Sequence, residues 1–288
     1  MLKFSSSIIR VNDLADTFLH HHIYIIFVEA ITSVLNLVQT RARNSFKMTS
    51  QISKESDFKE FYKRDGEDMK LKYMDSVAVR EKMTKEQVAN TFDKWVETGV
   101  YDTDVAAMKY TGPVVTADAA VHLYPNNREN ITMVDIAAGH GLLAVELRKQ
   151  GFKHIDAVDP SPASKKIAME KNLYGKYLVD FVDERRLDIK TDEYDCVISC
   201  GGFAPGLMPC CALNEMIRVA KPGGYVCISL PEYILRLTKE YTDRLEPLMN
   251  KYVNGGAWEK ISRTVVDNFL DQKPGIIYVF RVLKSEAC

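Results

Sequence analysis

Two glycines and an aspartate in the middle of the chain have the types and spacing of a nucleoside-binding crevice. Gly139 and Gly141 follow an apolar run over 131–136, which is short and rich in β-branched residues and therefore typical of a buried parallel strand. Glycines at such a point allow a tight turn and a close approach of a ligand to the backbone. Asp159 ends a second apolar run, where its carboxylate can accept hydrogen bonds from two ribose hydroxyls. The spacing predicts an adenosine site at the carboxyl edge of a sheet.

The glycine turn alone does not distinguish between two adenosine cofactors. Gly139-x-Gly141-x-x-Ala144 also fits the dinucleotide fingerprint, in which a pyrophosphate binds at the N-terminus of a helix. S-adenosylmethionine carries no phosphate, and its ammonium group is attracted by a carboxylate such as that of Asp135, which repels a pyrophosphate. Asp135 therefore favours S-adenosylmethionine. The alternative is that Asp135 only ties down the loop through backbone amides.

The elements that follow are predicted to bring more polar residues to the same edge. Ser161 can cap a helix over 163–171, and Pro162 suits the first turn of that helix. A third strand over 177–182 ends at Asp183, which is a candidate for the adenine amino group or, alternatively, a solvated loop carboxylate. The next predicted elements are a strand over 195–199, a helix over 211–220 that is stopped by Lys221-Pro222-Gly223-Gly224, and a strand over 225–230.

The end of the chain carries a topological signal. Residues 258–269 and 276–283 have the pattern of strands, and the turn sequence Asp271-Gln272-Lys273-Pro274-Gly275 separates them. Two strands joined so briefly must be antiparallel, because a parallel crossover needs about a dozen residues or more. A dinucleotide half-domain needs no such hairpin, so this feature also favours S-adenosylmethionine.

In this order, the motifs resemble those of class I S-adenosylmethionine-dependent methyltransferases. The resemblance covers roughly residues 90–288. It rests on Val134-Asp135-x-Ala137-x-Gly139-x-Gly141, Asp159, Asp183, Tyr194-Asp195-Cys196-Val197-Ile198, Lys221-Pro222-Gly223-Gly224 and the terminal hairpin. Within that superfamily the chain is most similar to the methyltransferase-like proteins of the Williams-Beuren syndrome region, through Phe92-Asp93-x-Trp95, Tyr101-Asp102-x-Asp104-Val105, Ala144-Val145-Glu146-Leu147-Arg148, Leu173-Tyr174 and Pro209-Cys210.

The resemblance implies both a fold and an activity. The fold is α/β, with a Rossmann-like seven-stranded methyltransferase sheet that is mostly parallel, ends in a C-terminal antiparallel hairpin and has helices on both faces. The cofactor is S-adenosyl-L-methionine, and the reaction is methyl transfer to an unidentified acceptor, either a small molecule or a protein. Two alternatives are an S-adenosylmethionine-binding protein without turnover and a nicotinamide-dependent oxidoreductase.

The resemblance also assigns cofactor contacts to matched residues. Gly139 and Gly141 let the loop pass under the cofactor, and Asp159, which Pro160 follows, holds the ribose. Asp183 reads the adenine together with the Glu184 backbone. The complete predicted cofactor set is Tyr101, Asp135, Ala137, Gly139, Gly141, Asp159, Pro160, Asp183, Glu184, Ser199 and Cys200.

Other positions in and around the loop have less defined roles. The resemblance implies that Ser199 and Cys200 line the floor of the site and that Tyr101 closes over the methionine end of the cofactor, where an aromatic face favours a sulfonium. The alternative is that Tyr101 is an ordinary packing tyrosine. Ala137 replaces the usual first glycine of the loop, and alanine requires a negative φ there. His140 stands where a small polar residue is common and is expected to be structural.

The acceptor side offers no catalytic constellation. Its candidates are Tyr101, Tyr110 and the segment 201–208, which alternatively forms a plain loop. This segment lacks the Asn/Asp-Pro-Pro-Tyr/Phe pattern that is associated with methylation of the amino groups of adenine and glutamine. Its absence disfavours these groups as acceptors. A general base matters only if the acceptor must lose a proton, and no catalytic residue is predicted.

Length and composition limit the number of domains and the classes of function that the chain can have. With 288 residues and 46% hydrophobic content, the chain can bury one substantial core, enough for one catalytic domain and an extension. Its net charge of -1 gives no support for nucleic-acid binding. The six cysteines match no zinc spacing, so no metal is predicted, and reduced thiols in the cytoplasm are expected.

The N-terminal part differs in character from the rest. We expect an extension over 1–47 that is not catalytic, a helical lead segment over 48–90 and a methyltransferase domain over 91–288. The apolar run 23–38 is shorter and more polar than the roughly 20 residues that a bilayer span needs. No firm membrane association is therefore predicted, although a helix on a membrane surface or a loosely packed helix stays an alternative. The sequence predicts no oligomeric state.

Overall fold

The computed structural model describes residues 83–97, 99 and 101–284. All of them belong to one compact unit, Tyr73–Cys288. The predicted N-terminal extension, its apolar run and most of the lead segment lie outside the described residues. Within the described part, no helix is long and apolar enough to cross a membrane.

A seven-stranded sheet forms the centre of this unit. The strand order is β3-β2-β1-β4-β5-β7-β6. Neighbours from β3 to β5 are parallel, whereas β7 is antiparallel to both β5 and β6. The predicted mostly parallel sheet with a terminal antiparallel hairpin is therefore confirmed. The strands are β1 (Thr132–Ile136), β2 (His154–Val158), β3 (Tyr177–Leu178), β4 (Tyr194–Cys200), β5 (Ala220–Pro231), β6 (Trp258–Leu270) and β7 (Lys273–Val282).

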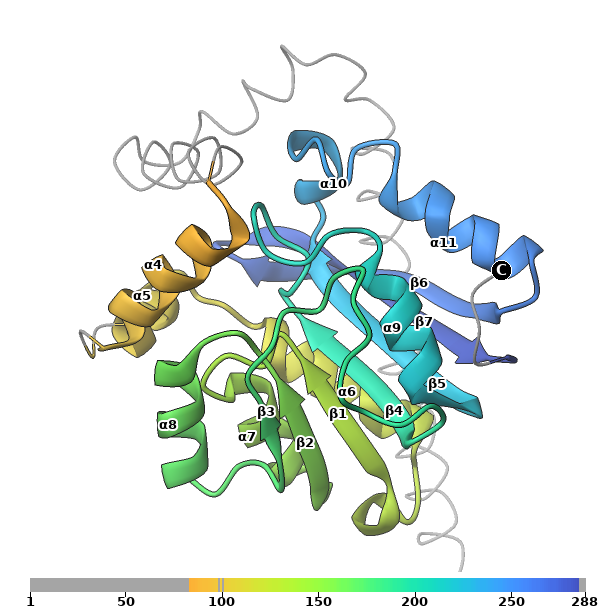
Figure 1. Ribbon diagram of the computed structural model, residues 1–288, viewed down its shortest axis with the longest axis horizontal. Coiled ribbons are helices and arrows are strands. Elements are labelled where there is room, and N and C mark those ends of the chain that lie inside the picture. Colours follow the sequence, from red (N-terminus) through yellow and green to blue (C-terminus); the bar gives the residue numbers. More distant parts are fainter. Residues whose placement is uncertain (1–82, 98, 100, 285–288) are drawn as a thin grey trace, which may run out of the picture. The chain divides into compact units, whose positions relative to one another are not determined.

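Helices cover both faces of the sheet. In Figure 1, α9 and α11 lie in front of the strands and α6 lies behind them, while α4 and α5 stand beyond the strand ends near α8. The helices are α4 (Lys85–Glu97), α5 (Tyr101–Ala107), α6 (Gly112–Leu123), the short 3₁₀ helix η1 (Arg128–Asn130), α7 (Leu142–Lys149), α8 (Pro162–Glu170), α9 (Ala212–Val219), α10 (Ile234–Leu237) and α11 (Leu245–Asn254).

The core lies on the central strands, where the apolar runs predicted it. Met133, Val134 and Ile136 of β1 are completely buried. Parallel strands with helices on both faces have continuous apolar sequences, which is why the run was recognisable. Trp258 of β6 and Phe280 of β7 stack with their ring centroids 4.0 Å apart, so the terminal hairpin packs its own aromatic layer.

Two elements are shorter than predicted. Strand β3 contains only Tyr177 and Leu178 instead of residues 177–182, because it pairs with β2 alone and the chain then leaves the sheet. The turn between β6 and β7 consists only of Asp271 and Gln272, whose φ values of 49° and 58° fit a two-residue hairpin turn. The Lys273-Pro274-Gly275 sequence, predicted as turn, therefore belongs to β7.

Candidate functional site

The glycine turn joins β1 to α7 through a series of left-handed residues. Ala137, Gly139 and Gly141 have φ values of 59°, 52° and 99°. The expected negative φ at Ala137 is therefore wrong. Its amide and that of Ala138 both donate to the Val158 carbonyl, at 2.8 and 3.3 Å, and these bonds hold the turn against the end of β2. Left-handed backbone costs an alanine about 1–2 kcal/mol, which the surrounding bonds must offset.

The two glycines of the turn serve different purposes. A Cβ added at Gly141 would come within 2.4 Å of Leu173 Cδ1, so close packing against the loop before β3 requires glycine there. A Cβ added at Gly139 would meet nothing within 4 Å. The backbone at Gly139 is thus open on the side where a side chain would stand.

Asp159 links the glycine turn to the start of α8. Its carboxylate accepts hydrogen bonds from the amides of Gly139 and Ser161, each at 2.9 Å. Burial raises the pKa of this carboxyl to about 6, although both hydrogen bonds favour the ionised form. Ser161 accepts from the Ser164 amide at 3.0 Å, which confirms the predicted helix cap. Pro160, between the two loop contacts, is half-buried.

Asp135 is buried in β1 directly before the turn. It accepts a hydrogen bond from the Tyr174 hydroxyl at 2.7 Å, whereas the alternative interpretation expected loop amides as its donors. Burial raises the pKa of the Asp135 carboxyl to about 7, and the bond from Tyr174 opposes this rise. Tyr177 donates to the Gly139 carbonyl at 2.7 Å. Tyr174 thus bonds to the end of β1 and Tyr177 to the turn. The sequence marked only Tyr174, as part of the resemblance.

The end of β4 adds a hydroxyl and a thiol beside the turn. The Ser199 hydroxyl is completely buried and has no hydrogen-bond partner among the described residues. A Cβ added at Gly202 would lie 2.5 Å from that oxygen and 2.8 Å from the Ala137 Cβ, so all three residues meet. The Cys200 thiol lies 3.0 Å from the Tyr110 hydroxyl, and burial raises its pKa, which keeps it protonated.

Tyr101 reaches the turn through a histidine. Its ring packs edge-on against His140, with centroids 4.8 Å apart, and against Trp95, with centroids 4.6 Å apart. His140 Nε2 lies 2.5 Å from Asp102 Oδ1. Burial raises the pKa of the Tyr101 hydroxyl to about 12. His140 therefore ties helix α5 to the glycine turn, in agreement with the structural role expected for it.

A second contact fastens helix α4 to the start of α8. Asp93 accepts hydrogen bonds from the Ser161 hydroxyl and from the Ala163 amide. The amide of the same Ser161 donates to the Asp159 carboxylate. Polar residues of the lead helices, as we call α4 and α5, thus contact the loops that follow both β1 and β2.

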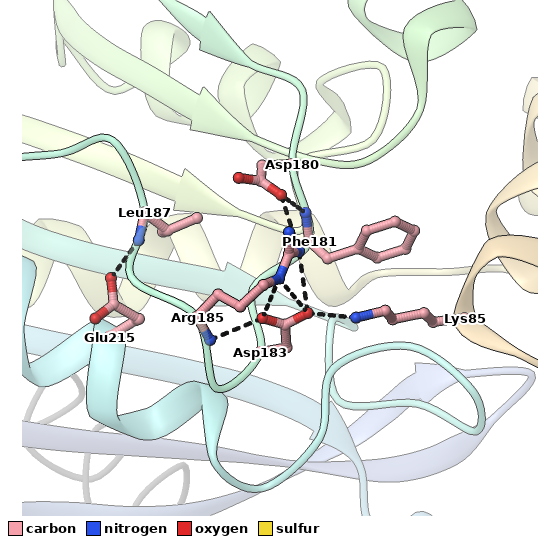
Figure 2. A network of polar contacts seen from close by, with 7 residues as sticks. All are labelled: Lys85, Asp180, Phe181, Asp183, Arg185, Leu187 and Glu215. Atoms are coloured by element: carbon pink, nitrogen blue, oxygen red, sulfur yellow. Dashed lines mark hydrogen bonds and ion pairs between the residues drawn. The ribbon is translucent and has the colours of Figure 1, made fainter.

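Asp183 is the centre of a polar network in the loop after β3 (Figure 2). It is 2% exposed, so the solvated-carboxylate interpretation is wrong. It bonds to the Arg185 side chain and, at 2.6 Å, to the Lys85 ammonium, which comes from the first residue of α4. Burial raises the pKa of the Asp183 carboxyl, but the hydrogen bonds from Arg185 and Lys85 outweigh that effect and lower the pKa to about 2. Glu184 next to it is exposed.

The sheet order places these groups along one edge. The loops after β3, β2 and β1 carry, in that spatial order, Asp183, Asp159 and Gly139, and Ser199 follows at the carboxyl end of β4 itself. The predicted residues are therefore brought to neighbouring strand ends, as a crevice for an extended adenosine compound requires. Sequence reasoning missed Lys85 and Arg185, whose only signal was charge.

Comparisons with known proteins find methyltransferases. A family model described as a methyltransferase domain matches residues 114–261, slightly more than half of the chain. Human methyltransferase-like protein 27 is 30% identical over 181 residues, which cover 63% of this chain and 72% of the relative.

Solved structures share the fold. A Leishmania major S-adenosylmethionine-dependent methyltransferase superimposes with a TM-score of 0.53 at 14% identity, covering 68% of this chain and 83% of that chain. A protein from a Haloferax volcanii complex that contains the Trm112 methyltransferase activator has a TM-score of 0.52 at 18% identity, covering 68% of this chain and 97% of that chain. At such identities the likeness concerns the fold alone.

Proposed function

Since the chain belongs to the methyltransferase-domain family, as a class I S-adenosylmethionine-dependent methyltransferase, we propose that its crevice binds S-adenosylmethionine along the predicted residues and presents the methyl group to an acceptor. The acceptor is a small molecule or a protein. We also propose a cytoplasmic location, which the free thiols of Cys196, Cys200, Cys210, Cys211 and Cys227 support.

One observation carries the proposal for the site. The buried Ser199 hydroxyl lacks a partner among the described residues, although burying such a group unpaired costs about 1–3 kcal/mol. It lies next to Gly202 and next to Ala137, which belongs to the glycine turn; in the same turn, a Cβ added at Gly139 would meet nothing within 4 Å. An orphaned hydroxyl close to this turn fits a bound polar ligand. S-adenosylmethionine has hydrogen-bond donors and acceptors that can pair with the Ser199 hydroxyl.

The carboxylates at the strand ends match the parts of the cofactor. We assign the ribose hydroxyls to Asp159, and the adenine amino group to Asp183 with the Glu184 backbone. Asp135, which burial brings to a pKa of about 7, gains an ionised partner when an ammonium group lies near it. Tyr101 stands at the same end through its contact with His140.

When bound, the cofactor would supply a methyl group carried on a sulfonium, and the rest of the cofactor would be the neutral thioether leaving group. The protein then needs little acid catalysis. Its residues hold the donor in one orientation and exclude water, and orientation alone can contribute roughly 7–11 kcal/mol. Tyr110 and the segment 201–208 remain our candidates for the acceptor side, and Tyr110 Oη touches the strand end at Cys200.

The test begins with cofactor binding and then follows methyl transfer. Calorimetric titration of the purified chain with S-adenosylhomocysteine and with NAD is expected to give binding only for the former. Binding of NAD alone would favour the oxidoreductase. Incubation with cell extract and methyl-labelled S-adenosylmethionine is expected to label an acceptor fraction. A chain that binds the cofactor and labels no fraction would be a binding protein without turnover.

A further inference from the structure

The acceptor positions of Asp183 are fully occupied. A carboxylate offers about four lone-pair sites. Its Oδ1 accepts from the Arg185 amide at 2.9 Å and from Arg185 Nε at 3.0 Å. Its Oδ2 accepts from Lys85 Nζ at 2.6 Å and from Arg185 Nη2 at 3.1 Å. Another donor, such as the amino group of adenine, must therefore displace one of these groups.

Lys85 is the group that can leave. Arg185 is only two residues from Asp183, and it binds through its backbone amide and its planar fork, with a further bond to Asp180 at 3.0 Å. Among the described residues, Lys85 makes a single hydrogen bond, to Asp183 98 positions away in sequence, and its side chain is 38% exposed. Its flexible stem can return the ammonium group to water, where it is strongly hydrated. Lys85 approaches Asp183 from another side than Arg185 in the view of Figure 2.

An aromatic ring beside this ion pair fits the same exchange. The Lys85 ammonium lies 5.2 Å from the centroid of the Phe181 ring, and Phe181 is half-buried in the loop that carries Asp183. When the ammonium group leaves, a ring face and a carboxylate oxygen become available together. A purine base needs such a pair, because it stacks on aromatic faces and donates from its amino group.

We propose that Lys85 is a displaceable occupant of the adenine subsite. Its ammonium holds Asp183 until the amino group of adenine takes its place. Lys85 thereby sets cofactor affinity by competition. The contacts of Asp93 with the start of α8 keep the middle of α4 attached during the exchange. This inference rests on the proposed function, since it requires adenine at Asp183.

The test compares S-adenosylhomocysteine binding by isothermal titration in the full chain and in Lys85→Met. The variant is expected to bind about 3- to 10-fold more tightly, because the ligand no longer breaks an ion pair with one exposed partner. Lys94→Met is the matched control, since Lys94 is an exposed lysine in the last turn of the same helix. It is expected to leave the affinity unchanged. Lys85→Arg keeps the charge and is expected to show no gain.

A deaminated ligand separates competition from a general change of the crevice. The purine-riboside analogue of S-adenosylhomocysteine carries a hydrogen atom in place of the amino group and has no donor for Asp183. Lys85→Met is expected to give no gain with this ligand. Equal or weaker binding of S-adenosylhomocysteine by a folded Lys85→Met would overturn the inference, and so would an equal gain with both ligands. Absence of S-adenosylhomocysteine binding in the unmodified chain would instead refute the proposed function.

Discussion

Removing the Tyr174 hydroxyl is expected to raise the pH at which the cofactor binds strongly. Burial raises the pKa of Asp135 to about 7, and the hydrogen bond from Tyr174 works against this rise. A hydrogen bond to a charged group contributes about 1.5–3 kcal/mol, and one pKa unit corresponds to about 1.4 kcal/mol. Tyr174→Phe therefore raises the Asp135 pKa further, by about one to two units.

The proposed contact with the cofactor ammonium group requires an ionised Asp135. At pH 7 about half of the Asp135 carboxyls are ionised in the unmodified chain, and about 1–10% in Tyr174→Phe. The affinity for S-adenosylhomocysteine at pH 7 is then expected to fall by about 5- to 50-fold and to recover as the pH rises. Titrations from pH 5.5 to 8.5, in buffers of different ionisation enthalpy, measure both the affinity and the proton released on binding.

A matched control removes a neighbouring hydroxyl that contacts no carboxylate. Tyr177→Phe loses its bond to the Gly139 carbonyl and is expected to leave the midpoint of the pH profile in place. A folded Tyr174→Phe whose midpoint coincides with that of the unmodified chain would refute the role of Asp135.

The same carboxyl has a consequence for stability. The folded-state pKa of Asp135 lies above the unfolded value of 3.8, so between these values the unfolded chain binds fewer protons. The free energy of unfolding of the ligand-free chain therefore falls as the pH rises from 4 to 7, by up to about 4 kcal/mol from this group. Asp183, with its pKa lowered to about 2, acts in the opposite direction but only below pH 4. Urea unfolding at pH 5 and pH 7.5 measures the slope, which Asp135→Asn is expected to reduce. Part of the remaining slope comes from Asp159, whose pKa burial raises to about 6.

Three further predictions concern the strand ends. Asp159→Ala is expected to weaken S-adenosylhomocysteine binding by about 10- to 150-fold, as the loss of charged hydrogen bonds implies, and unchanged affinity in a titration would show that the ribose lies elsewhere. Ala137→Gly is expected to change the free energy of unfolding by no more than about 1 kcal/mol, because relief of left-handed strain and the greater chain entropy of glycine oppose each other; urea unfolding checks this. Gly141→Ala is expected to lose more stability than Gly139→Ala, because only Gly141 meets a side chain at 2.4 Å, and thermal unfolding of the two variants side by side decides the order.

Local sequence sufficed for the turn and its strands. The apolar run before Gly139 and the cap at Ser161 each depend on residues within a few positions, so period and propensity determine them. The antiparallel hairpin followed from the length of its connection alone. The predictions were wrong where contacts with a neighbouring strand determine the local structure. The φ of Ala137 is determined by bonds to the end of β2, and the short β3 reflects its single neighbour in the sheet.

Part of the polar environment of the crevice could not be predicted because Lys85 and Asp102 are distant in sequence from their partners. Asp183 belongs to a charged stretch that resembles solvated surface, yet Lys85 and Arg185 make its burial possible by pairing both oxygens. Asp102 likewise belongs to an acidic segment and contacts His140 across 38 positions. In the pairs Lys85–Asp183 and Asp102–His140, one partner comes from the lead helices and the other from a strand-end loop. The charged residues of α4 and α5 can therefore be assigned to the site only once the fold has brought them to the strand ends.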